Sequence, residues 1–201
     1  MQELLRLLKR DWSRILLIML FFVFSVYLGT LLPKYAPELA QQIQKEYLNK
    51  FSGILELMKN APLILQILII FGNNLMASLI VILTGMLIVP VIPLFSLVGN
   101  GVGIGLLQTV ITAKSGFDPT RFYLALLPHG IFELTAFFIA VLMGVRFGLV
   151  PYRLVLHYYR TKEYQPFFLE YFQELRYYGV LILVLLAIAA VIEMTVSPLI
   201  L

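Results

Sequence analysis

The sequence contains no cysteine, a single tryptophan and only two histidines among its 201 residues. The absence of cysteine excludes disulfides, thiolate metal sites and cysteine nucleophiles, so any chemistry must use oxygen and imidazole groups. Charge is also scarce, because Asp, Glu, Lys and Arg make up 13% of the chain while hydrophobic residues make up 61%. With a mean hydropathy of +0.93, this balance is that of an integral membrane protein.

Five stretches of the chain are apolar enough to cross a bilayer. A hydrocarbon core of about 30 Å needs about 20 apolar residues per helix. The segments that meet this length lie at about 15–32, 62–89, 91–112, 122–148 and 178–200. The first has no small-residue cleavage site of the kind that ends a signal peptide, so we interpret it as a retained helix. The sequence therefore predicts an all-α membrane protein, in which residues 1–201 form a single polytopic domain built as a bundle of five transmembrane helices.

Basic residues are distributed unevenly over the two sides of this bundle. Nine of the 15 Lys and Arg residues flank the side that contains the N-terminus, and six flank the other side. By the positive-inside rule, this bias places the N-terminus in the cytoplasm and, with five spans, the C-terminus outside. No basic patch with interleaved aromatic residues accompanies the net charge of +4, so nucleic acid is not indicated as a partner. The partner that the composition does define is the lipid bilayer.

Two connections are long enough to hold structure of their own. Residues 37–60 place apolar side chains at helical spacing opposite Gln, Glu and Lys, which predicts an extracytoplasmic amphipathic helix. Residues 152–177 mix basic and aromatic side chains, as segments at the headgroup level do, and predict a cytoplasmic interfacial helical segment. Both could simply cap the bundle against lipid headgroups. Alternatively, the outer helix docks a partner through Ile43, Tyr47 and Phe51.

The fourth apolar segment carries two titratable residues in its interior. His129 and Glu133 are four residues apart, so they share one face of a helix. An ionisable group at mid-bilayer costs roughly 2.5 to 3.5 kcal/mol, so both residues need partners inside the protein. Pro128 has no backbone N–H and should kink or break the helix just before His129. At its start, Asp118 can cap a helix whose first residue is Pro119.

Further polar residues are expected in the same layer of the membrane. At a rise of about 1.5 Å per residue, Glu133 lies about 16 Å below the outer surface of the bilayer. The residues that fall near this depth by the same count are His129, Glu193, Asn100, Asn73 and Asn74. Four of the five spans therefore contribute a polar or titratable group to one layer.

Small residues indicate where helices approach each other closely. Gly101 and Gly105 form a GxxxG pair in the third segment, and Gly144 and Gly148 form another in the fourth. We expect these glycines to mark faces where helices pack. Such faces could also join two copies of the chain, because closed two-fold homodimers are the commonest assemblies.

A longer motif surrounds the histidine and glutamate pair. Residues 127–136 read LPHGIFELTA. This stretch resembles the hallmark of the stage II sporulation protein M family, which is Leu-Pro-His-Gly followed by Glu-Leu-x-Ala. The similarity extends to Asn73-Asn74, to Asn100-Gly101 with Gly105, to Gly144 with Gly148, and to Ile192-Glu193 with Pro198. Two departures are Thr135, where family members often have Pro, and Met194-Thr195, where a small residue and an aromatic are usual.

The resemblance implies a small multi-pass protein of the cytoplasmic membrane. The sporulating namesake of the family acts in engulfment of the forespore, where it helps to localise peptidoglycan-degrading partner proteins at the septum. The family also occurs in organisms that make no spores. The implied function is therefore that of an assembly or scaffold factor in cell-envelope remodelling, with the outer amphipathic helix as the docking surface for its partners.

The polar layer itself allows three physical accounts. Protonated Glu133 and Glu193 could hydrogen-bond to His129 and the asparagines as a clamp between helices. The same three side chains could bind a divalent metal such as zinc, with an open position for water. The layer could instead line a route for protons, ions or a small polar solute, which would make the chain a transport component. The HxxxE spacing differs from the HExxH arrangement of metalloproteases, so we predict no catalytic residues and a protein that is not an enzyme.

Overall fold

The computed structural model describes residues 2–85, 90–116, 118–163 and 166–196. Within these ranges the chain forms six α-helices and no strand. They are α1 (Gln2–Tyr35), α2 (Pro37–Met58), α3 (Leu63–Gly85), α4 (Ile92–Ser115), α5 (Pro119–Thr161) and α6 (Phe167–Thr195). All of them except α2 are long and apolar enough to cross a membrane. The prediction of an all-α bundle with five spanning helices is confirmed.

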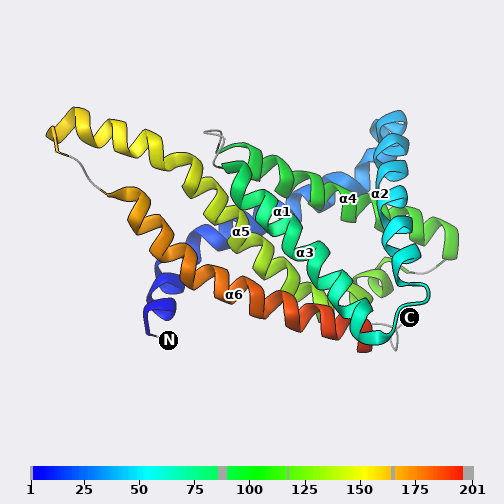
Figure 1. Ribbon diagram of the computed structural model, residues 1–201. Helices are drawn as coiled ribbons and strands as arrows, with labels where there is room; N and C mark the ends of the chain where they lie inside the picture. The colour runs from blue at the N-terminus through cyan, green and yellow to red at the C-terminus, as the bar shows by residue number, and fades with distance from the viewer. Residues whose placement is uncertain (1, 86–89, 117, 164–165, 197–201) are drawn as a thin grey trace.

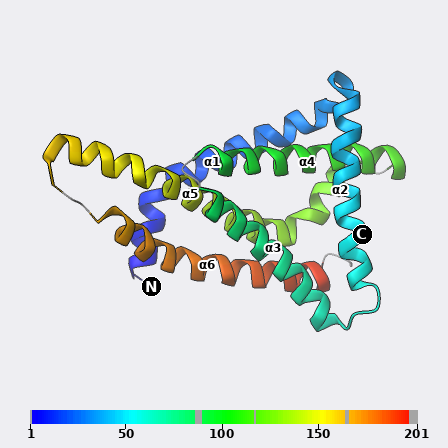
Figure 2. The ribbon, with the colours of Figure 1, turned by 45° about the horizontal axis from the view of Figure 1, so that its top comes forward.

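Helix α5 lies at the centre of the bundle. In its most apolar stretch 72% of the residues are buried, a far larger share than in any other spanning helix of the described ranges. Helices α3 and α6 pack along α5, and α1 packs mainly along α4 (Figure 1). The start of α1, the end of α5 and the start of α6 lie at one end of the bundle, and α2 lies at the other end (Figures 1 and 2). The chain therefore enters and leaves at opposite ends, as five spans require.

Local sequence signals explain where α4 ends and where α5 begins. The Asp118 side chain accepts a hydrogen bond from the backbone N–H of Thr120 at 3.0 Å, and Pro119 is the first helical residue of α5. The predicted cap is thus confirmed, because a carboxylate satisfies a backbone donor that the first turn leaves free. Gly116, with φ of 67°, ends α4 in the left-handed conformation that glycine adopts without strain.

The predicted interfacial segment at residues 152–177 is helical, but it is not a separate helix. Its first part continues α5 to Thr161, and its second part begins α6 at Phe167. Pro151 lies inside α5 without ending that helix. In Figure 1 the end of α5 (yellow) projects beyond the rest of the bundle. The predicted ends at residues 86–89 and 197–200 lie outside the described residues.

Helix α2 covers most of the predicted amphipathic helix and crosses the end of the bundle at a steep angle to the spanning helices (Figure 2). One side chain fixes it there: the Tyr47 hydroxyl donates a hydrogen bond to the Gly99 carbonyl oxygen of α4 at 2.9 Å. Burial raises the pKa of the Tyr47 phenol above its ordinary value, and the neighbouring charge of Glu46 adds to this shift. The phenol therefore stays neutral and able to donate this bond at physiological pH.

Candidate functional site

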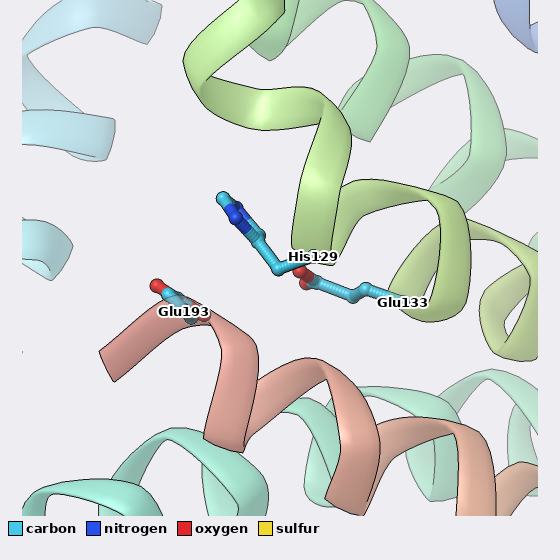
Figure 3. Close-up of side chains that lie close together, drawn as sticks. All are labelled: His129, Glu133 and Glu193. Atoms are coloured by element: carbon cyan, nitrogen blue, oxygen red, sulfur yellow. The ribbon is translucent and has the colours of Figure 1, made fainter. Parts of the chain in front are cut away.

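Three titratable side chains from two helices meet inside the bundle. His129 and Glu133 belong to α5, and Glu193 belongs to α6. One potential ligand atom from each residue lies within 4.8 Å of the other two. His129 is buried and the two glutamates are half-buried. Figure 3 shows the three side chains gathered where the two helices face each other. The structure thus brings together the three titratable residues that the sequence placed at one depth.

This trio has a donor set with defined chemical uses. One imidazole nitrogen and two carboxylates are the kind of three-residue set that holds zinc in sites with an open fourth position. The same groups can share hydrogen bonds across the contact between α5 and α6, which offsets part of the cost of placing them in a membrane interior. Either use requires these two helices to be held in a fixed register.

Pro128 bends α5 but does not end it. The helix is continuous through this residue, so a full break at the predicted position does not occur. The alternative that we predicted, a kink, agrees with Figure 3, in which α5 changes direction next to His129. A membrane helix tolerates the lost hydrogen bond because neighbouring helices and small adjustments of the backbone satisfy the freed carbonyl.

The asparagines predicted in the same layer occupy different settings. Asn73 and Asn74 of α3 are half-buried, and the Asn73 side-chain amide donates to the Asn74 side-chain oxygen at 3.2 Å. Asn100 of α4 is exposed, and it donates to the Ser96 carbonyl of its own helix at 2.8 Å. The prediction of Asn100 as a buried ligand candidate is therefore wrong. Its neighbour Gly101 turns toward α1, which leaves Asn100 on an open side of α4.

The two GxxxG pairs lie at contacts within the chain. Gly101 and Gly105 approach α1 so closely that an added Cβ atom would collide with its backbone or side chains. Gly144 has the same relation to α3, and a Cβ atom on Gly148 would lie 2.9 Å from Pro90. Both glycine pairs are therefore covered by other parts of the same chain. A homodimer would therefore have to use another surface.

A buried ion-pair cluster, which sequence reasoning missed, lies at the other end of the bundle. Asp11 of α1 is 0% exposed. Its carboxylate accepts hydrogen bonds from Arg10 at 2.9 Å, from Arg14 at 2.8 Å, from Arg146 of α5, and from the Tyr178 hydroxyl of α6 at 2.7 Å. Three helices far apart in sequence thus converge on one carboxylate.

Glu174 of α6 completes this ion-pair cluster. It accepts a hydrogen bond from Arg10 at 2.6 Å and another from Arg146 at 2.8 Å. Arg146 is only 8% exposed, so its charge depends on Glu174 and Asp11 for compensation. Sequence reasoning treated these arginines only as flanking charges. An available signal was the acid Asp11 inside a basic flank, with Arg14 three residues further along the same helix.

The residues predicted to dock a partner are partly covered by the chain itself. Ile43 and Tyr47 are half-buried, and Tyr47 bonds to α4. The side chain of Phe51 lies outside the described residues. Among the side chains of α2 that the structure describes, the large apolar ones that are exposed are Leu39, Leu48, Leu55 and Leu57. The predicted stripe therefore faces the bundle at two of its three positions, and other leucines of α2 are the ones open to a partner.

These features define a class: a helical membrane protein with five spanning helices, a titratable trio inside the bundle and a buried ion-pair cluster toward one end. The chain belongs to the stage II sporulation protein M family, whose model matches residues 18–198. This range includes His129, Glu133 and Glu193, and it confirms the resemblance noted in the sequence. Membership indicates a multi-pass membrane protein related to a sporulation protein.

A relative with a shorter match comes from Methanocaldococcus jannaschii and is described as an uncharacterized protein. It is 32% identical over 104 residues, which cover 51% of this chain and 55% of the relative. The chain thus matches about half the length of that protein. No solved structure matches the chain significantly.

Proposed function

We propose that this protein is a membrane-embedded assembly factor for cell-envelope remodelling, without enzymatic activity of its own, that positions peptidoglycan-degrading proteins at the outer face of the cytoplasmic membrane. The observation that carries the proposal is α2, a helix that crosses the end of the bundle and is hydrogen-bonded to α4. Membership in the stage II sporulation protein M family supports the same function. The finer role, docking of a cell-wall enzyme, rests on the surface of α2.

The exposed surface of α2 has an apolar face, and the helix is hydrogen-bonded to α4. Leu48 and Leu55 are 42% and 50% exposed, and they lie seven residues apart, which places them on one face of α2. Tyr47 anchors the helix to α4 on a neighbouring face. An exposed apolar face on a helix that is bonded to the bundle is suited to a partner that lays a groove over it. We call Leu48 and Leu55 the outer face of α2.

A photo-crosslinking experiment tests the docking. We expect a photoreactive amino acid at position 48 or 55 to link to a protein with peptidoglycan-degrading activity, detected in a gel that contains cell-wall substrate. The matched control is position 159, an exposed tyrosine near the far end of α5. Replacing both Leu48 and Leu55 with Gln should also release the partner from pull-downs. Links to lipid alone, or a partner retained by the Gln variant, would contradict docking on the outer face.

The proposal requires the N-terminus to be cytoplasmic and α2 to lie outside. The positive-inside rule supports this orientation. Because the chain contains no cysteine, single cysteines can be introduced without a background of other thiols. We expect a membrane-impermeant maleimide to label Gln42→Cys in intact cells and Tyr159→Cys only after the membrane is opened. The reverse pattern would place α2 in the cytoplasm and exclude an outer partner.

A second candidate function, metal binding, is favoured by the trio of His129, Glu133 and Glu193. Their ligand atoms lie close enough together to share one ion. We expect elemental analysis of the purified protein to find about one zinc per chain. The His129→Ala variant should lose it, whereas His157→Ala, which alters the other histidine of the chain, should keep it. A parent protein without stoichiometric metal would leave the trio as a hydrogen-bonded clamp between α5 and α6 or as part of a route for protons, ions or a polar solute.

A further inference from the structure

A small cavity adjoins the ion-pair cluster at the end of the bundle that contains the N-terminus. Its volume is about 190 Å³, and it lies between α1, α5 and α6. Four arginines line it: Arg10 and Arg14 from α1, and Arg146 and Arg153 from α5. Two acids of α6, Glu170 and Glu174, line it as well. Neither the scaffold function nor the metal site proposed above uses this cavity.

The cavity lies at the level where the apolar parts of three helices end. Arg14 directly precedes the apolar run of α1, and Arg146 interrupts the apolar run of α5. Glu174 lies one turn before the apolar run of α6. In a bilayer, this is the depth of the lipid headgroups and their phosphates. A ligand in the cavity can therefore be reached both from the water and from the surrounding lipid.

The positive charge around the cavity is only partly balanced. Arg10 and Arg146 are held by their shared bonds to Glu174, and both also bond to Asp11, so their guanidinium groups are fixed in orientation. Arg14 donates to Asp11 through one nitrogen and keeps a side chain that is 54% exposed. Arg153 forms no ion pair with any residue in the described ranges. Cations with N–H donors to spare thus remain at the rim.

Tyr171 lines the same cavity, and its buried hydroxyl group lacks a partner within the described residues. Tyr171 of α6 is 4% exposed, and its hydroxyl forms no hydrogen bond with the part of the chain that the structure describes. Its ring stacks on Phe147 with 4.5 Å between ring centroids, so the hydroxyl cannot turn away easily. Leaving such a group without a hydrogen bond destabilises the folded protein. An acceptor placed in the cavity would remove this cost.

We propose that this cavity binds a phosphate-type oxyanion, which accepts hydrogen bonds from the Tyr171 hydroxyl and from the guanidinium groups of Arg14 and Arg153. Planar guanidinium groups bind phosphate oxygens well because their N–H donors match the spacing of those oxygens. A water molecule takes up about 30 Å³ in the liquid, so the cavity holds an anion the size of phosphate together with some water. The anion is either free phosphate or the phosphate of an anionic lipid.

Binding measurements on the purified full-length chain test the site. Inorganic phosphate is titrated into the protein in a neutral detergent and followed by calorimetry. In parallel, the protein in nanodiscs of mixed phosphatidylglycerol and phosphatidylcholine is released into a mass spectrometer to identify retained lipids. Loss of one charge-assisted hydrogen bond should weaken binding about tenfold or more, and we expect this for Arg153→Gln and for Tyr171→Phe. The controls are Arg160→Gln and Tyr177→Phe, which make the same changes on the same helices outside the cavity.

The outcomes separate the two sources of phosphate. Calorimetric binding of phosphate that only the two cavity variants weaken supports a soluble ligand. Selective retention of phosphatidylglycerol by the parent and the controls, but not by the cavity variants, supports a lipid headgroup. Equal behaviour of cavity variants and controls, or no binding of either probe by the parent, overturns the proposal. Arg153→Gln alters an exposed side chain, so the test does not depend on whether Tyr171→Phe folds normally.

Discussion

Replacing Asp11 with Ala should destabilise the bundle more than any other single change to a charged residue described above. The carboxylate is 0% exposed and accepts bonds from three arginines and Tyr178. Arg10 and Arg14 are partly exposed and can turn to water when it is removed. Arg146 and Tyr178 are buried and cannot. Breaking a buried ion pair in this way costs about 3–5 kcal/mol.

The structure places the expected loss near the lower end of that range, at about 3 kcal/mol, because Arg146 keeps its bond to Glu174. Asp11→Asn retains an oxygen acceptor and should lose less, about 1–2 kcal/mol. The assay is the free energy of unfolding in mixed micelles, obtained from an SDS titration followed by circular dichroism.

The matched control is Glu3→Ala, which removes an acid from the same helix. Glu3 pairs with Arg6 at 3.5 Å on an exposed surface, so its loss should change the free energy of unfolding by no more than about 0.5 kcal/mol. If Asp11→Ala and Glu3→Ala unfold at the same SDS fraction, the ion-pair cluster does not hold α1, α5 and α6 together, and the reasoning is refuted.

Two further predictions concern the contacts between helices. Gly144→Ala should destabilise the bundle by about 1–3 kcal/mol in the same assay, because a Cβ atom there would lie 2.5 Å from the Val81 carbonyl oxygen of α3. The control is Gly179→Ala, which should be neutral or stabilising because a Cβ atom there would have nothing within 4 Å. Equal stability of the two variants would contradict this packing. Tyr47→Phe should loosen α2 by about 1 kcal/mol, seen as faster amide hydrogen exchange in α2 than in the parent or in Tyr35→Phe. Because the pKa of Tyr47 is raised, the folded state holds its proton more tightly than the unfolded state, so the contact is intact at neutral pH and weakens as the pH rises past 10.0. The stability difference between the parent and Tyr47→Phe should therefore shrink above that pH, and a difference that stays constant would contradict this.

Long apolar runs made the five spanning helices predictable, since only helices of that length satisfy their backbone groups inside a bilayer. The meeting of His129, Glu133 and Glu193 was predictable for a related reason. Each residue interrupts an apolar run, and counting residues along two antiparallel helices gives similar depths. Counting residues gives only the depth of a side chain in the membrane. That these three side chains also lie on the facing sides of α5 and α6 is a result of the structure.

Depth in the membrane does not predict which side of a helix packs against its neighbours and which side stays open. Asn100 lies at a suitable depth but on an open side of α4, because the adjacent Gly101 brings the opposite side against α1. The ion-pair cluster around Asp11 was missed for another reason. Charges beside an apolar run are usually solvated, and only the convergence of α1, α5 and α6 removes Asp11 and Arg146 from water. That convergence depends on packing between distant segments.

Helices α5 and α6 carry both polar clusters, one toward each end of the same antiparallel pair. Glu133 and Arg146 are separated by about 20 Å along α5, and Glu193 and Glu174 are separated by about 28 Å along α6. The two helices therefore meet at two polar junctions as well as along their packed apolar sides. Any ligand that altered their crossing angle at one junction would alter the geometry of the other, and thermodynamic reciprocity would make the effect equal in both directions.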